Sequence, residues 1–402
     1  MPRCLLAVYA GLLLLLAAAS AVGGLLLFRD LSSGDPIDAV ANRHAYDVMG
    51  WELRHFPQKW LYKLATVFDG GRSGAEDDAL LRRYFALADE IGRLERQDDG
   101  SGRLAEARRE RDEIENDAEE TLETRIGDFL REQGLAMNPP LFSDIDMLFP
   151  PVDFELDRPP KLLAVSPRDR IELDRSYLLT PGLGTDAVAA IERETEETRV
   201  SAIVVNTGGI ATYPSVIPEL APFSEMVETA IHEWLHQYLA FYPLGRSYFG
   251  GERARTLNET VANIAGRELA ELFAQRYGSP EPPEPAAPTS PPPDGFDFTA
   301  EMRALRLRVE ELLAAGRVEE AERLMNEKRD EFQSEGVYIR RINQAYFAFH
   351  GSYADTPGSI DPIGPKLQTL RHRAGSAAQF VRLARGISSE VELDRLLEGP
   401  QR

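Results

Sequence analysis

The stretch from Ser224 to Leu239 reads SEMVETAIHEWLHQYL, and the other segments of the chain are easiest to interpret from it. Its apolar residues recur at every fourth position, at Val227, Ile231, Leu235 and Leu239. This spacing is typical of a helix with one buried face. Ser224 is of a residue type that caps helices, and Pro243 marks the expected end. We therefore predict one helix over this stretch.

The pentapeptide His-Glu-Trp-Leu-His occupies residues 232–236 of this predicted helix. The whole chain has 6 histidines among 402 residues, so the pattern is informative. Chance would supply about 0.01 such pentapeptides in a chain of this composition. Residues four apart are neighbours on a helix, so both imidazoles can turn toward one ion with Glu233 beside it. The alternative is a solvated helix with two accidental histidines.

A catalytic zinc site needs a third protein ligand. The metzincin pattern would place Gly at position 239 and His at 242, but the chain has Leu239 and Tyr242, which excludes that family. A second helix is predicted from residue 257 to Tyr277, and it opens Leu-Asn-Glu. Its Glu259 lies 23 residues past His236 (259 − 236), enough for a loop that returns this helix alongside the first.

Two helices that carry His-Glu-x-x-His and Asn-Glu-x-x-x resemble the gluzincin metallopeptidases, the thermolysin-like group that includes many aminopeptidases. The resemblance covers roughly residues 200–270. It implies that His232, His236 and Glu259 are zinc ligands and that Glu233 is the catalytic base. A role for Glu259 as an ordinary surface glutamate is the alternative, because one carboxylate at loose spacing is a weaker signal than the pentapeptide.

Two further segments have places in the gluzincin pattern. The residue four after the ligand glutamate is an aspartate in that pattern but Asn263 here, which can still orient an imidazole but cannot raise its basicity as a carboxylate does. The alternative for Asn263 is simple helix packing. Asn206, Gly208 and Gly209 end a predicted strand before the motif helix, where gluzincins have a strand that pairs with the substrate backbone. A plain structural strand is the alternative there.

An aromatic cluster near the C-terminus is the candidate for stabilising the oxyanion. Tyr346, His350 and Tyr353 fall at helical spacing on one face. A gluzincin commonly uses a Tyr or His to donate a hydrogen bond to the developing oxyanion, so we expect His350 and Tyr353 to be catalytic. Core aromatics with a satisfied histidine are the alternative.

Composition narrows the possible partners and metal ligands. With 45 basic and 66 acidic residues the formal charge is −21, which would repel the phosphates of a nucleic acid. The single cysteine, Cys4, leaves the chain beyond it without a thiol for a zinc ribbon or a cysteine nucleophile. A metal site must therefore use His and carboxylates.

The N-terminal segment is long and apolar. No charged residue occurs from Cys4 to Phe28, and at about 1.5 Å per residue such a stretch crosses a hydrocarbon core of roughly 30 Å. We predict a signal-anchor at residues 1–29 in the cell membrane, with the bulk of the chain outside the cytoplasm, periplasmic or extracellular. A cleaved signal peptide is the alternative, because small residues at 17–21 suit a signal peptidase.

The fold class predicted from these patterns is α+β: mostly helical, with a zincin-like core, a small β-sheet and helical hairpins. Strands are expected at 161–165, 175–179 and 201–206. Helical hairpins are expected at 75–133 and 298–333. The predicted regions are the anchor at 1–29, a helical region at 30–137, the core at 138–278, a Pro-rich loop at 279–296 and a helical region at 297–402 that completes the site.

The function predicted from the sequence is a membrane-anchored zinc metallopeptidase that acts on a peptide or protein substrate. The main alternative is an inactive binding protein on the same scaffold, and a helical membrane-surface assembly factor is a third. An intact Glu233 argues against the inactive version, because a binding module does not need a base beside the metal ligands. Endo- or exopeptidase action and the oligomeric state stay open.

Overall fold

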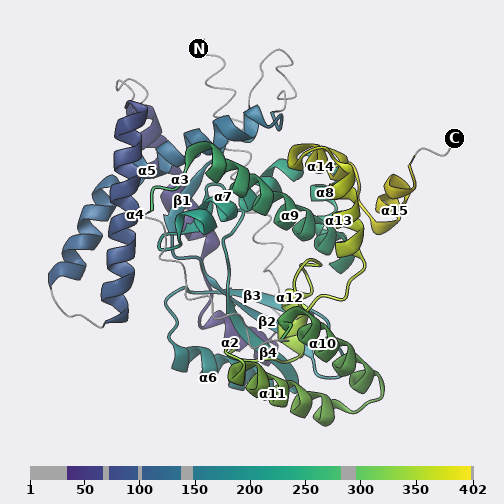
Figure 1. Cartoon of the computed structure of the whole chain (residues 1–402). Coiled ribbons are helices and arrows are strands. Elements are labelled where there is room, and N and C mark those ends of the chain that lie inside the picture. Colours follow the sequence, from purple (N-terminus) through teal and green to yellow (C-terminus); the bar gives the residue numbers. More distant parts are fainter. Residues whose placement is uncertain (1–33, 67–71, 98–101, 137–147, 282–295, 400–402) are drawn as a thin grey trace.

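The computed structural model describes residues 34–66, 72–97, 102–136, 148–281 and 296–399. Within these ranges the chain is mostly helical with a small sheet content, which confirms the α+β class (Figure 1). The zincin-like core stays a prediction. No helix among the described residues is long and apolar enough to cross a membrane. The anchor predicted at residues 1–29 lies outside the described residues.

Two neighbouring helices, α7 (Phe223–Leu239) and α9 (Glu252–Tyr277), form the centre of the molecule. The prediction that Ser224 caps the first of them is wrong, because α7 begins one residue earlier, after Pro222. No side chain of the N-cap residue satisfies its first turn; instead the Phe223 N–H donates to the Glu281 carboxylate at 3.0 Å. The carboxylate of Glu281, distant in the sequence, therefore caps α7 in place of the Ser224 hydroxyl.

Small residues let the two helices approach closely. A Cβ on Gly266 of α9 would lie 3.4 Å from the Cβ of His232, so the glycine packs directly on the backbone of α7. The connection between the helices contains the short helix α8 (Pro243–Arg246) and the 3₁₀ turn η1 (Tyr248–Gly250). It ends at Gly251, whose φ of 122° lies where L side chains are strained.

A three-stranded antiparallel sheet lies below this helix pair in Figure 1. Strand β2 (Lys161–Pro167) is central, between β3 (Arg175–Leu179) and β4 (Val200–Asn206), which confirms the three predicted strands. One face packs apolar side chains against α2 (Pro36–Asn42) and α6 (Thr185–Glu196). The other face packs against α12 (Gln344–His350), the helix that carries the C-terminal aromatic cluster.

A second sheet, of two short parallel strands, was not expected. It pairs β1 (Phe154–Asp157) with β5 (Ser215–Pro218). The outer edge of β1 is satisfied by side chains of α5 (Gly102–Glu132): Glu119 accepts the Leu156 N–H at 2.6 Å and Glu123 accepts the Phe154 N–H at 2.9 Å. Four-residue strands with one partner strand depend on such remote acceptors, so a local sequence pattern does not reveal them.

The helices outside this centre agree with most of the expected elements. The first predicted hairpin is α4 (Gly74–Arg96) with α5, and the second is α10 (Phe298–Ala314) with α11 (Val318–Ser334). The C-terminal part adds α13 (Ile363–Arg373), α14 (Ala377–Ala384) and α15 (Glu390–Glu398), which pack on α9. The largest apolar cluster combines α4, α5, α7, α9 and α13 to α15, so it contains residues from three of the predicted regions. The proposed domain boundaries stay predictions.

Helix α3 (Val48–Thr66) contains Pro57 and continues through it, although a proline inside a helix removes one backbone hydrogen bond. Beyond the proline it is held by a buried ionic cluster. Lys59 lies 2.7 Å from Glu119 and 3.0 Å from Glu123, and Lys63 bridges Glu123 and Asp153. The Lys59 side chain is 3% exposed, and its ammonium also donates to the carbonyl of Phe154. This cluster fixes α3, α5 and β1 to one another.

We predict that Lys59→Met destabilises the protein by roughly 3–5 kcal/mol, because Glu119 and Glu123 would be left buried beside an apolar side chain. The matched control is Arg93→Met, which removes an equal charge from an exposed pair with Asp89. That variant should change the free energy of unfolding by less than about 1 kcal/mol. Urea unfolding of both variants measures the difference, and equal small losses would contradict the role given to the cluster.

Candidate metal centre

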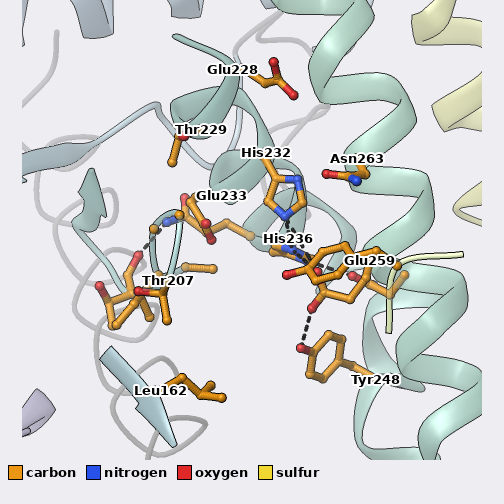
Figure 2. Close-up of a pocket in the computed structure, with 18 of the residues that line it drawn as sticks. Leu162, Thr207, Glu228, Thr229, His232, Glu233, His236, Tyr248, Glu259 and Asn263 are labelled. Atoms are coloured by element: carbon orange, nitrogen blue, oxygen red, sulfur yellow. Dashed lines mark hydrogen bonds and ion pairs between the residues drawn. The ribbon is translucent and has the colours of Figure 1, made fainter. Parts of the chain in front are cut away.

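The structure brings the three predicted metal ligands together. His232 and His236 come from α7 and Glu259 from α9, and one potential ligand atom of each lies within 4.8 Å of the others (Figure 2). The two Nε2 atoms are 3.0 Å apart, and the Glu259 Oε2 lies 3.7 Å from that of His232 and 3.4 Å from that of His236. The adjacent helices place these atoms, because His232 and His236 are one turn apart on the face turned to α9.

These distances match the requirements of zinc. Tetrahedral ligands bonded at about 2.0–2.1 Å lie about 3.3–3.4 Å from one another, and the three observed separations bracket that value. Two imidazoles and one carboxylate, with no thiolate, are also the donor set of a catalytic zinc site with a free position. The residues present therefore fit the ion that the sequence predicts.

Electrostatics also favours a cation at this point. Burial works against a charged imidazole, but the negative charge of Glu259 and its hydrogen bond outweigh it and raise the pKa of His236 to about 9. Burial would raise the pKa of Glu259, yet the neighbouring His236 and hydrogen bonds from both histidines hold it well below its usual range. The carboxylate thus draws a proton onto the cluster, and a metal ion would displace that proton.

Two polar neighbours that the sequence analysis did not identify orient these ligands. The Nδ1 of His236 lies 2.7 Å from the Asn258 side-chain oxygen, which leaves Nε2 facing His232 and Glu259. The Tyr248 hydroxyl, on η1, donates to Oε1 of Glu259 at 2.6 Å and leaves Oε2 facing the histidines. Asn258 directly precedes Glu259, so the dipeptide Asn-Glu could have indicated that Asn258 lies next to the metal ligands. Tyr248 lies in a connecting turn and offered none.

Asn263 lines the same cavity, but its described hydrogen bonds run elsewhere. Its amide donates to the Asp355 carboxylate at 3.1 and 3.3 Å. Among the described residues no hydrogen bond joins it to a ligand histidine, so its predicted orienting role stays a prediction. The carboxylate of Asp355, 4% exposed, is instead shared between Asn263 and Arg267.

Glu233 lies beside the ligands and faces the segment after β4. Its burial, together with the charge of Glu259, raises the pKa of its carboxyl group, while the two histidines oppose the shift. A Cβ on Gly209 would lie 2.8 Å from the Glu233 Oε1 and 2.7 Å from a methyl carbon of Thr229. The Gly209 backbone therefore rests against the carboxylate, and only a glycine fits there.

A cavity of about 720 Å³ joins these parts. The predicted strand residues Asn206, Gly208 and Gly209 line it, as do the predicted ligands and Glu233. His350 and Tyr353 line it as well, and they come from the end of α12 and the turn beyond it, more than 90 residues after Glu259. All predicted site residues therefore surround one space.

Tyr346 is the member of the aromatic cluster that does not line the cavity. Its ring centroid lies 4.3 Å from that of His350, and it packs with apolar residues of the sheet and of α10 and α11. Burial lowers the pKa of His350 to about 4, so this imidazole is neutral at physiological pH. The negative charge of Glu259, together with burial, raises the pKa of Tyr353 well above its usual value. Tyr353 therefore stays protonated and can donate.

We predict that Gly209→Ala lowers any activity of this site strongly, because the new methyl group would displace Glu233 or Thr229. The matched control is Gly182→Ala, since Gly182 does not line the cavity and a Cβ there meets no atom within 4 Å. Gly209→Ala should also lower the melting temperature, because its Cβ would lie 2.9 Å from the Val216 carbonyl oxygen, so its activity is compared per folded molecule. The control should melt like the parent protein. A Gly209→Ala variant with parental activity would show that the site does not need the close contact between Gly209 and Glu233.

Comparison with known proteins gives no relative for this chain. No protein-family model, no curated protein and no solved structure matches it. The functional conclusion therefore depends on the residues and geometry of this cavity.

Proposed function

We propose that the protein is a zinc-dependent metallopeptidase with a zincin-like core that hydrolyses peptide bonds. The observation that carries this proposal is the convergence of His232, His236 and Glu259 with a buried Glu233 beside them. In the proposed enzyme the first three residues hold zinc, and Asn258 and Tyr248 fix the ligand atoms that face it. The N-terminal segment at residues 1–29 would anchor the enzyme to the membrane, with the cavity outside the cytoplasm.

A bound zinc ion would supply a Lewis acid that polarises the scissile carbonyl and acidifies water. Glu233 would accept the proton of the attacking water and pass it to the nitrogen of the leaving amine. Its environment supports this role, because burial raises its pKa toward the range in which a carboxyl group both accepts and releases a proton. The contact with Gly209 keeps the carboxylate at the cavity wall.

His350 and Tyr353 would stabilise the oxyanion that forms as the water adds to the carbonyl. Both line the same cavity as Glu233, and a neutral imidazole and a protonated phenol are both hydrogen-bond donors. Asn206 and Gly208 lie along a segment with little side-chain bulk, which would let an extended peptide approach. An inactive binding protein is the rival function, and the buried base beside the ligands favours catalysis over it.

The test of the proposal is metal content and peptide cleavage on the same preparations. Alanine at His232, His236 or Glu259 should remove the zinc, because each supplies one of three ligand atoms. Glu233→Gln should retain zinc and lose turnover, because its carboxylate acts on the water and not on the ion. Unchanged zinc content in the triple alanine variant would refute the site. Full turnover in Glu233→Gln would refute the assignment of the base.

A second prediction concerns the oxyanion donors. Tyr353→Phe or His350→Gln should keep folding and zinc but lower kcat by about a hundredfold, the scale of losing one such donor. Tyr346→Ala is the contrasting variant, since this residue packs outside the cavity. It should cost roughly 3–5 kcal/mol of stability and lower activity only as the folded fraction falls. Parental turnover in both cavity variants would return His350 and Tyr353 to a packing role.

A further inference from the structure

The proposed catalytic cavity has an apolar end and an acidic end. Figure 2 shows Leu162 of β2 at one end and Glu228 of α7 at the other, with His232 and Glu233 between them. A peptide that spans the cavity would therefore meet different chemistry on each side of the bond to be cleaved. The inference that follows rests on the proposed function and concerns the class of peptide that the cavity accepts.

The apolar end is a part of the sheet. Leu162 pairs in register with Leu178 of the next strand, so the two side chains stand together on one face. Phe349 of α12 packs against the same face, and all three residues line the cavity. A large apolar side chain of a substrate would bury its surface there, at about 25 cal/mol per Å².

The acidic end has an excess of negative charge. Glu228 lies one turn before His232, and its carboxylate is 3.8 Å from Arg267, the nearest cation. Arg267 also lies 3.3 Å from the buried Asp355, so its charge is divided between the two carboxylates. Glu225 and Glu271 are close enough to act on the charge of Glu228 as well. Among the described residues, Arg267 is thus shared by Glu228 and Asp355, and Glu225 and Glu271 add further negative charge near Glu228.

At the end that carries Glu228, the described part of the cavity wall has no lysine or arginine to balance a substrate carboxylate. Among the described residues that line it there is neither a lysine nor an arginine, while Glu225 and Glu228 both take part in the wall. An acidic side chain or a free C-terminal carboxylate would therefore lie among like charges without a partner. A cationic group would instead complete the charge balance around Glu228.

We propose that the cavity selects peptides with a large apolar side chain on Leu162 and Leu178 and a basic residue beside Glu228. Peptides with an acidic residue beside Glu228 are rejected. Glu228 and Leu162 are then the specificity-determining residues of the two ends. The two preferences are set by different walls of the cavity, so each can be removed separately.

The experiment uses the full chain loaded with zinc and a panel of octapeptides in which a single Lys, Gln or Glu is moved through each position. A second panel moves Leu or Ala in the same way. At the best position Lys should exceed Glu in kcat/KM by tenfold or more. Glu228→Gln should reduce this Lys to Glu ratio roughly three- to tenfold. Leu162→Ala should lower the Leu to Ala ratio roughly tenfold and leave the charge ratio unchanged.

Two controls separate the inference from the proposed function. Glu327→Gln removes an equal charge from an exposed pair with Arg323 on α11, away from the cavity wall, and should keep the parental charge ratio. Peptide binding to the Glu233→Gln protein, followed by fluorescence anisotropy, gives the same ratios without turnover. If no peptide is cleaved but the binding ratios hold, the peptidase proposal fails and the selectivity stands. Equal binding of Lys and Glu peptides, no binding, or a ratio unchanged in Glu228→Gln would overturn the inference.

Discussion

The close packing of α7 on α9 is the contact on which the rest of the site depends. Gly266 lets the two backbones meet beside His232, and that approach brings Glu259 within 3.4 to 3.7 Å of the two imidazole nitrogens. A Cβ at position 266 would be in van der Waals contact with His232 at 3.4 to 3.6 Å, which shows how closely α9 packs on α7 beside the ligands. Ligand distances in a metal site vary by only about 0.2 Å, so the packing of the two helices has to hold this approach. The large apolar cluster around both helices therefore stabilises the fold and also the distance between Glu259 on α9 and the histidines on α7.

Local patterns in the sequence predicted the elements that carry the ligands. The four-residue apolar period around His232 and the Asn-Glu pair at Glu259 each lie in one helix, and helical spacing follows from neighbouring residues alone. The three strands of the main sheet were likewise visible as short runs rich in apolar residues. What the sequence could not reveal depends on distant partners. The β1 edge is satisfied by glutamates of α5, and α7 is capped by Glu281 rather than by Ser224.

The same division applies within the cavity. Gly209 was expected at the end of a strand that pairs with the substrate backbone. The structure shows another reason for a glycine at this position, since Glu233 and Thr229 leave no room for a Cβ. Tyr248 had no motif, because its hydroxyl reaches Glu259 only through the path of the turn between the two helices. His350 and Tyr353 reach the cavity because α12 packs on the sheet face opposite α2 and α6. Their placement follows from tertiary packing, which spacing along the chain does not encode.

Charge connects the two halves of this site. Glu233 and Glu259 are both buried, and two buried carboxylates are stable in their charged form only if positive charge accompanies them. In the protein alone that charge is a proton held by His236, which explains why its pKa rises to about 9 although burial opposes it. A divalent cation held by the same atoms would supply more charge than the proton does, and it would leave Glu233 free to exchange protons with water. The negative charge of the buried carboxylates therefore favours a bound cation, and once the cation balances that charge, Glu233 can act as a base beside it.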